Sequence, residues 1–474
     1  MRKRPEIGVG QLVLQIAFPE GAASNGTGET EVDGLEASGG SSAARSKPER
    51  KRKWYSLIDK VYALPNLHAA WEKVKANGGA AGVDGVTVKA FGEGVEARLQ
   101  QLSDDLRRKT YRPQPVRRVY IPKSGGGKRP LGIPTVRDRV VQQAMRQILE
   151  PIFEGKFSNR SHGFRPERGC ATALEVVDRA IRHGYQWVVD ADIQAFFDSV
   201  DHTKLLAAVN EEIADGSVLR LIAQMLEAGV VEPETSETEP AELGTPQGGP
   251  ISPLLANIYL HVFDQEITQG GYGLVRYADD FVIFARSQSE AAAAKALAQE
   301  ILEGRLGLRL HPEKTRVVSV DEGFEFLGFH YYRDPVTGQR CKEVRRKSVR
   351  SFGNAIRERT PRLKTQRWVK PRNVTLGDLG KNRRLAETIQ KLNRYLRGWH
   401  WYFKTAVLRY EPPFGSFDGF VRRRVRAAIT GRVGSGWWNQ RITNGMLREL
   451  GLLSLVELQR QYQQGLLEAP ARKG

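Results

Sequence analysis

Apolar side chains recur along the chain with a helical period in several segments, and this spacing predicts where helices begin and end. Residues 54–76 show it clearly. The apolar residues after Thr135 predict a second helix, with Thr135 and Asp138 as a capping box and Pro151 as its end. A third helix is predicted to begin at Ser252, because proline follows and suits the first turn.

Other segments are short, apolar and rich in β-branched or aromatic residues, which predicts strands. They are WVVDADI (187–193), GLVRY (273–277), FVIFA (281–285) and FEFLGFHYY (324–332). Helices and strands mix without strict alternation, so the pattern favours an α+β fold over a doubly wound sheet. The chain beyond residue 340 is predicted to be helical and basic.

Positive charge is concentrated at the C-terminal end. The 474 residues include 73 Lys and Arg against 54 Asp and Glu, a net charge of +19. Residues 340–474 alone hold 31 basic and 9 acidic side chains, a net charge of +22. A surplus of this size over one region indicates a polyanionic partner, because neutralising phosphates releases counterions. Nucleic acid is the leading partner, and an anionic membrane surface is the alternative.

Composition argues against several other classes of protein. Cys170 and Cys341 are the only cysteines, too few for a disulfide framework or a Cys-rich zinc site, so we expect no zinc. No apolar run approaches the length of a membrane span. The N-terminus faintly resembles a signal peptide, but Gln15 interrupts its apolar run and Glu20 follows. We therefore expect a cytoplasmic bacterial protein without a membrane partner.

Carboxylates lie at two strand ends. Asp279 and Asp280 stand between two apolar strand segments, which places them at a hairpin tip, although acidic residues in turns often serve the turn alone. Asp192 ends a third apolar segment, where an unpaired buried carboxylate would be costly. If adjacent strands bring these side chains together, they could hold a pair of Mg²⁺ ions for phosphoryl transfer.

The motifs that contain these carboxylates resemble a known family. YADD (277–280) resembles the metal-binding hairpin of reverse transcriptases, and DIQAFFD (192–198) resembles their first palm motif. Further matches follow in order along most of the chain: IPKSGGGKRPLGIPTVRDRVVQQA (121–144), SHGFRPERGCAT (161–172), QGGPISPLLANIYL (247–260), LGLRLHPEKT (306–315) and FEFLGFHY (324–331). The ordered set is similar to the group II intron-encoded branch.

This resemblance implies a right-hand polymerase with fingers and palm, followed by an α-helical thumb or maturase region. The regions expected from it are a flexible N-terminal tail (1–50), an N-terminal extension (51–90), the reverse transcriptase fingers and palm (91–335) and the basic helical thumb/maturase region (336–474). Many relatives carry a further HNH-type endonuclease with paired cysteines, and no such pattern is present in this sequence.

The resemblance also assigns catalytic roles. Asp192 and Asp279 are implied to be the main Mg²⁺ ligands, and Asp280 completes the acidic set. The Ile193 carbonyl is implied to contribute to the metal site. Asp198 and the nearby Asp201 precede a helical run, so capping is expected of them instead.

Nucleotide contacts are expected in the fingers and beside the palm. Lys123 and Arg129 flank the glycine loop SGGGK; a basic surface turn and a triphosphate clamp both fit this pattern, and the resemblance favours the clamp. Gln247 precedes two glycines that allow close backbone approach to a nucleotide. Phe197 matches the aromatic position that blocks a 2′-OH, with an ordinary core phenylalanine as the alternative.

The basic C-terminal region interleaves arginines with aromatic residues. GWHWYFK (398–404) resembles the thumb or maturase region of group II intron proteins, which helps bind the intron RNA. We expect most of its aromatic side chains to fill a core. The arginines are the better RNA candidates: Arg394, Arg397, Arg422, Arg423, Arg424 and Arg426.

Three functional hypotheses are consistent with these motifs and with the charge distribution. The first is an RNA-directed DNA polymerase that copies an RNA template from a DNA primer with dNTPs and Mg²⁺, and also binds its group II intron RNA to assist splicing. The second is an RNA-binding maturase that no longer uses its polymerase. The third is a reverse transcriptase of another bacterial system, such as a retron, a defence system or a CRISPR-associated enzyme.

Overall fold

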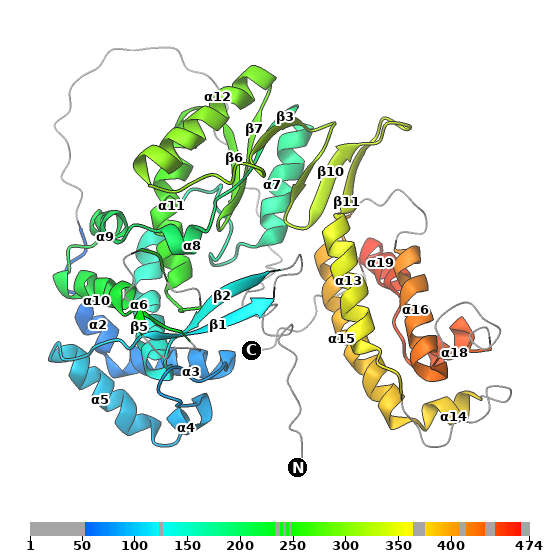
Figure 1. Cartoon of the computed structure of the whole chain (residues 1–474), viewed down its shortest axis with the longest axis horizontal. Coiled ribbons are helices and arrows are strands. Elements are labelled where there is room, and N and C mark those ends of the chain that lie inside the picture. Colours follow the sequence, from blue (N-terminus) through cyan, green and yellow to red (C-terminus); the bar gives the residue numbers. More distant parts are fainter. Residues whose placement is uncertain are drawn as a thin grey trace. The chain divides into compact units, whose positions relative to one another are not determined.

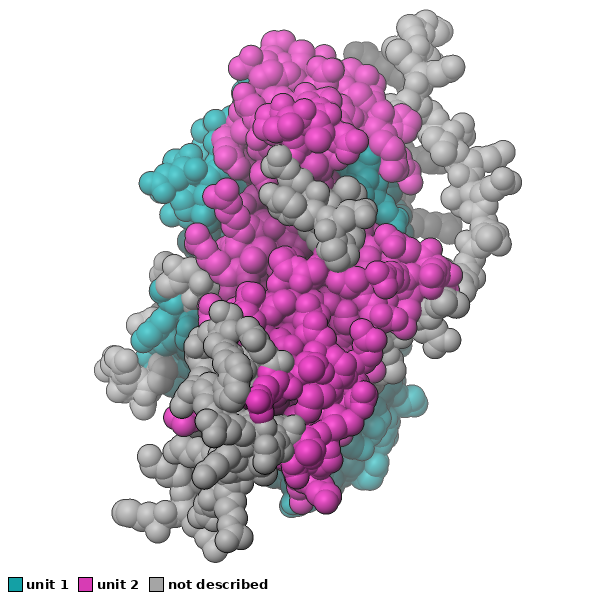
Figure 2. Space-filling view, turned by 90° about the vertical axis from the view of Figure 1, so that its right-hand side faces the viewer, with its two compact units in different colours: residues 1–178, 191–283, 292–315 teal, residues 179–190, 284–291, 316–474 magenta. Residues whose placement is uncertain are grey.

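The structure is a computed structural model that describes residues 53–122, 127–232, 238–239, 243–245, 248–363, 375–406, 414–431 and 441–465. Figure 1 shows the arrangement of its helices and strands and labels many of them. The chain divides into two compact units, coloured separately in Figure 2. The first takes Met1–Asp178, Ala191–Ile283 and Ala292–Thr315, and the second takes the rest.

The first unit holds the fingers-like hairpin and most of the helices before residue 316. Its elements are α2 (Ile58–Tyr62), α3 (Leu64–Asn77), α4 (Val88–Gly92), α5 (Val95–Arg107), β1 (Val116–Pro122), β2 (Lys128–Ile133), α6 (Val136–Glu154), α8 (Phe196–Ser199), α9 (His202–Asn210), α10 (Gly216–Glu227), β4 (Val230–Val231), β5 (Thr238–Glu239), α11 (Ser252–Gln269), β6 (Gly273–Tyr277) and the π-helical turn η1 (Glu300–Arg305).

The second unit holds a small sheet followed by helices. Its elements are β8 (Arg316–Ser319), β9 (Phe324–Phe326), β10 (Phe329–Arg333), β11 (Arg340–Val344), α13 (Arg346–Arg359), α14 (Leu376–Gly380), α15 (Arg383–Phe403), α16 (Gly415–Thr430), α18 (Asn444–Glu449) and α19 (Leu455–Gln463). Unit boundaries fall inside four further elements: α7 (Cys170–Arg182), β3 (Trp187–Asp192), β7 (Asp280–Ala285) and α12 (Gln288–Gln299).

Three sheets organise the described strands. One has the order β2-β1-β4-β5, in which β1 and β2 form an antiparallel ribbon that pairs Ile121 with Arg129. The second has the order β6-β7-β3-β8, and the third the order β11-β10-β9. The apolar segments that predicted strands at β3, β6 and β7 are therefore confirmed, and the mixture of helices and sheets confirms the α+β class.

The helix after Thr135 differs from its prediction at both ends. Its Pro151 lies inside α6, which continues to Glu154 and buries Phe153 in the core. A proline removes one backbone donor, and here burial of the final turn outweighs that loss. At the start, the Thr135 hydroxyl accepts a hydrogen bond from the Asp138 amide, which is half of the predicted capping box. The Asp138 carboxylate accepts from the Tyr111 hydroxyl, the Gln114 amide and the Thr135 hydroxyl in place of the Thr135 amide.

Residues 324–332 form two strands instead of one. β9 and β10 pair antiparallel, and the chain reverses between them at Leu327 and Gly328. Both residues have positive φ, +45° and +86°, which is the backbone conformation of a tight hairpin turn. The sequence pattern did not predict this turn because Leu327, an apolar residue and not glycine, occupies one of its two positions with positive φ.

The core of the palm is formed around α11. This helix has buried residues on every side, and it packs against β6. Its predicted start at Ser252, with proline in the first turn, is confirmed. Along the described residues, no helix has both the length and the apolar character needed to cross a membrane.

Candidate active site

Asp192 is the last residue of β3, and the segment that follows η1 runs beside it. The His311 amide donates to the Asp192 carbonyl at 2.8 Å. Three residues further on, Lys314 Nζ lies 2.6 Å from Asp192 Oδ2. Both side chains remain accessible, with exposed fractions of 58% for Lys314 and 37% for Asp192. Strand β3 therefore ends with the Asp192 carboxylate at the surface, where the Lys314 ammonium forms an ion pair with it.

The other two carboxylates lie where the sequence predicted them, at the β6–β7 hairpin. Ala278 and Asp279 form the turn, and Asp280 is the first residue of β7. Burial raises the pKa of Asp279 above its ordinary value, and the nearby Asp192 carboxylate raises it further, while Arg129 acts in the opposite direction. The site therefore places like charges near one another in a partly desolvated position, which favours a bound cation.

Arg129 is the one described member of the predicted nucleotide clamp. It is an exposed residue of β2, and its positive charge partly opposes the rise in the pKa of Asp279 that burial causes. The fold thus brings the fingers ribbon and the acidic hairpin together within the first unit. Lys123 and Gln247 lie outside the described residues.

Phe197 lies in α8, five residues after Asp192, and is nearly buried at 8% exposure. Its ring meets Phe196 edge to face, with 5.1 Å between ring centroids. The Phe197 carbonyl accepts the Thr245 amide at 2.7 Å, and a side chain at Gly244 would lie 2.7 Å from the same oxygen. The Phe197 backbone is therefore in direct contact with the segment Gly244–Thr245. Asp201 caps α9 as expected, whereas Asp198 lies within α8 and caps nothing there.

The donor set fits a hard divalent cation. Asp192, Asp279 and Asp280 supply carboxylate oxygens, the ligands that Mg²⁺ prefers. The Lys314 ammonium on Asp192 shows that a cation is accommodated at this carboxylate. Within the described part of the chain, no three His, Cys, Asp or Glu side chains already converge as a metal centre. The carboxylates are thus brought to one region by the fold without being fully assembled around one point.

The arginines predicted to bind RNA fall into two groups within the second unit. Arg394 and Arg397 are exposed on α15, and Arg423 is exposed on α16. The remaining three are half-buried and bonded within the fold. Arg422 lies 3.8 Å from Asp418, Arg424 donates to Thr360, and Arg426 donates to the Ile442 carbonyl at 2.7 Å.

The aromatic residues of this region behave largely as expected. Trp399 and Phe403 are buried, and Trp399 packs against Phe352 with ring centroids 4.6 Å apart. Trp401 and Tyr402 are half-buried; the Lys404 ammonium lies over the Trp401 ring, and the Tyr402 hydroxyl donates to the Leu327 carbonyl. These rings therefore hold the helices to one another and to the small sheet.

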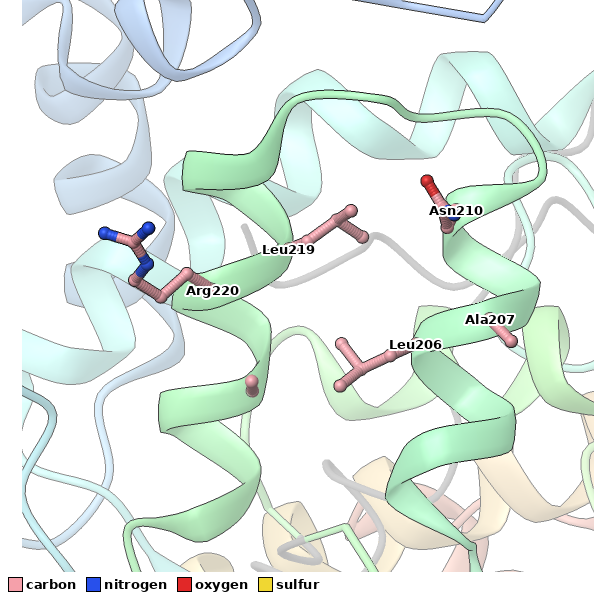
Figure 3. Close-up of a pocket in the computed structure, with 6 residues that line it drawn as sticks. Leu206, Ala207, Asn210, Leu219 and Arg220 are labelled. Carbon is pink, nitrogen blue, oxygen red and sulfur yellow. The ribbon is translucent and has the colours of Figure 1, made fainter.

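A surface pocket of about 370 Å³ lies between α9 and α10. Leu206 of α9 and Leu219 of α10 point toward each other across it, with Arg220 and Asn210 at its margins (Figure 3). None of its lining residues is a carboxylate, and none belongs to the acidic site.

Two functional features escaped the sequence reasoning. Lys314 lies in a quoted motif, yet nothing in the local pattern pairs it with Asp192, 122 positions earlier. Arg276 is fully buried within β6, directly before the acidic hairpin. A charged residue inside an otherwise apolar strand was a usable signal here, because such a residue requires a buried partner.

Comparisons with known proteins match two family models to successive parts of the chain. Residues 121–331 match the family model for reverse transcriptase (RNA-dependent DNA polymerase), which contains the acidic site and Arg129. Residues 372–442 match the model for the group II intron maturase-specific domain, which contains most of the basic helical region. Both families act on RNA, and reverse transcriptases use a divalent metal ion.

Individual relatives cover different shares of the chain. Protein YkfC of Escherichia coli is 38% identical over 291 residues, which are 53% of this chain and 76% of that protein. Group II intron-encoded protein LtrA of Lactococcus lactis is 42% identical over 219 residues, 45% of this chain but only 36% of that protein. Among solved structures, a partial Cas6-RT-Cas1–Cas2 complex is 24% identical, covers 55% of this chain and 43% of that chain, and has a TM-score of 0.34.

The reverse transcriptase match, the maturase match that follows it and the similarity to an intron-encoded protein occur in one chain. The chain therefore belongs to the group II intron reverse transcriptase/maturase family, and by class it is an RNA-directed DNA polymerase.

Proposed function

We propose that this protein copies RNA into DNA at the acidic site of its first unit. The observation that carries the proposal is that β3, which ends at Asp192, lies beside β7, which begins at Asp280 directly after Asp279. In the proposed reaction, a primer 3′-hydroxyl attacks the α-phosphate of a dNTP and pyrophosphate leaves. Mg²⁺ bound to these carboxylates would stabilise the attacking and leaving oxygens.

The chain's own residues have distinct tasks in this proposal. Asp192, Asp279 and Asp280 would hold the metal, and the Ile193 carbonyl would add a neutral oxygen. Arg129 neutralises the triphosphate from β2, and Lys123 and Gln247 are the further nucleotide contacts that the sequence predicts. Phe197 forms the wall against a 2′-hydroxyl, consistent with its nearly buried position.

We also propose that the second unit binds the intron RNA and assists its splicing, which would couple the two activities in a mobile element. Three exposed arginines on α15 and α16 supply charge without being needed as internal hydrogen-bond donors: Arg394, Arg397 and Arg423. Splicing without DNA synthesis remains the alternative function. A role in a retron, defence or CRISPR-associated system is disfavoured by the maturase-specific match.

The decisive experiment is primer extension on an RNA template with Mg²⁺, comparing wild type with Asp279→Ala. We expect synthesis to fall at least about 100-fold, because metal-held charge stabilisation is worth several kcal/mol. Asp198→Ala is the matched control, since it removes an exposed carboxylate from the neighbouring α8. RNA binding should be unchanged in both variants. A folded wild type that makes no DNA would favour the splicing-only alternative.

A further inference from the structure

Arg276 is completely buried beneath the acidic hairpin and forms a dense set of hydrogen bonds there. Its Nε and Nη2 donate to the two carboxylate oxygens of Asp264 at 2.6 and 2.5 Å. Neither side chain of this pair has any exposed surface. Its Nη1 donates to the Asn257 side chain at 3.0 Å and to the Ala278 carbonyl at 2.9 Å. Four of the five guanidinium N–H groups are thus directed at named acceptors.

The partners of Arg276 lie on one face of α11. Asn257 and Asp264 are seven residues apart, or two helical turns, so both side chains face β6. Asn257 also donates to the Gly163 carbonyl at 2.9 Å. The Arg276 backbone is bonded to the segment around Ser161. The Arg276 amide donates to the Arg160 carbonyl, and the His162 amide donates to the Arg276 carbonyl.

Gly163 packs directly against the backbone of the hairpin turn. A Cβ added at this glycine would lie 2.3 Å from the Ala278 nitrogen, so the two backbones are in direct contact. Ala278 itself has φ +58°, a left-handed conformation that residues with a Cβ adopt at an energetic cost. The hairpin clamp, defined as Arg276, Asp264, Asn257 and Gly163, therefore surrounds the one strained residue that precedes Asp279.

A buried ion pair is a poor means of stabilising a core, because apolar residues of similar size often serve as well. What the guanidinium adds is a fixed, planar set of donors that reaches three acceptors at once. One of those acceptors is the carbonyl of the strained turn residue. Holding that carbonyl fixes the peptide plane between Ala278 and Asp279, and with it the direction in which the Asp279 side chain leaves the backbone.

We propose that Arg276 is a positioning residue: through the hairpin clamp, it holds Ala278 in its left-handed conformation so that Asp279 faces Asp192. Its catalytic consequence rests on the proposed polymerase function, whereas its structural consequence does not. Arg276 touches no substrate and acts only through the hairpin backbone.

The test is Arg276→Lys, which keeps the positive charge for Asp264 but cannot also reach Asn257 and the Ala278 carbonyl as a planar fork. Hydrogen exchange is measured on the peptide covering residues 273–283, together with kcat and KM for single-nucleotide addition. We expect faster exchange at the hairpin and a kcat lowered between about 10- and 100-fold, because small misplacements of a catalytic group have effects of this size. The KM for primer–template should stay within about twofold of the wild-type value.

Arg146→Lys is the matched control, because Arg146 forms an ion pair with Glu150 on α6 and serves no hairpin residue. If Arg276→Lys does not fold, Arg276→Leu combined with Asp264→Leu removes both buried charges and leaves neither uncompensated. Wild-type exchange and kcat in a folded clamp variant would overturn the proposal. If wild type makes no DNA, the polymerase proposal fails, while the exchange measurement still decides whether the clamp orders the hairpin.

Discussion

Lys314 Nζ lies 2.6 Å from Asp192 Oδ2, so an ammonium group occupies the carboxylate that the sequence assigns to a metal ion. The pair is formed between residues of the first unit that are 122 positions apart. Because both side chains are substantially exposed, water screens the interaction, and exposed pairs of this kind contribute about 0.2–1 kcal/mol. Such a weak bond can be displaced by a divalent cation.

This relationship predicts that Lys314 competes with the metal for Asp192. Lys314→Ala should strengthen binding of Mn²⁺, used as a spectroscopic substitute for Mg²⁺, by up to about fivefold, the equivalent of a 1 kcal/mol competitor. Electron paramagnetic resonance of free Mn²⁺ measures this without requiring turnover. Lys156→Ala, which removes a lysine 3.7 Å from Glu212, is the control. Unchanged or weaker Mn²⁺ binding in Lys314→Ala would show that the lysine does not compete.

Phe197 and Phe196 allow a sharp test of sugar selection. Phe197→Val should raise the efficiency of ribonucleotide addition relative to deoxynucleotide addition at least about tenfold, because it opens space beside the 2′ position. Phe196→Val is the matched control: Phe196 is 2% exposed, so its truncation should lower the melting temperature without changing the selection. The ratio of kcat/KM for rNTP and dNTP is the measurement. Equal ratios in wild type and Phe197→Val would make Phe197 an ordinary core residue.

Arg423 and Arg424 are neighbours in sequence but differ in role. Arg423 is exposed, so Arg423→Gln should weaken RNA binding and reduce the slope of log affinity against log salt by about one phosphate contact. Arg424 is held by the Thr360 hydroxyl and carbonyl, each at 3.3 Å, so Arg424→Gln should lower the melting temperature and leave the salt slope unchanged. Filter binding over a salt series separates them. The same slope change in both variants would contradict the assignment.

His162 predicts a pH dependence of stability. Burial is the main cause that lowers its pKa from 6.5 to about 3, and four nearby positive charges add to it: Arg168, Arg165, Arg160 and Arg276. A histidine whose pKa is depressed in the folded state contributes stability above pH 6.5, and this contribution is lost as the pH falls toward 3. Within that window, one proton changes the free energy of unfolding by about 1.4 kcal/mol per pH unit.

His162→Asn should remove the contribution of His162 to the pH dependence of the free energy of unfolding. Asparagine keeps a polar group near Thr172, whose hydroxyl lies 2.9 Å from the His162 Nδ1. Urea unfolding of both proteins between pH 7.5 and 4 is the measurement. His261 and two other histidines also have pKa values lowered by burial, so wild type and variant should both lose stability in acid. Parallel curves for the two proteins would mean that His162 is protonated equally in the folded and unfolded states.

Local patterns predicted the strands and helices of the palm because those patterns report which side chain faces a core. The apolar runs at β3, β6 and β7 and the proline start of α11 are examples. Local patterns predicted the wrong boundary where tertiary contacts outweighed the local preference of a residue. Pro151 continues its helix because Phe153 is buried beyond it, and Leu327 turns the chain because two strands pair around it.

The family motifs, the three carboxylates and the positive charge of residues 340–474 can all be recognised in the sequence. The partners of the carboxylates could not be: the ion pairs of Lys314 with Asp192 and of Arg276 with Asp264 are visible only in the folded chain. Hydrophobic periodicity can be recognised locally, because it depends on whether each side chain in a segment is apolar or polar. Ion pairs and hydrogen bonds depend instead on distances between segments far apart in sequence, and folding alone sets those distances.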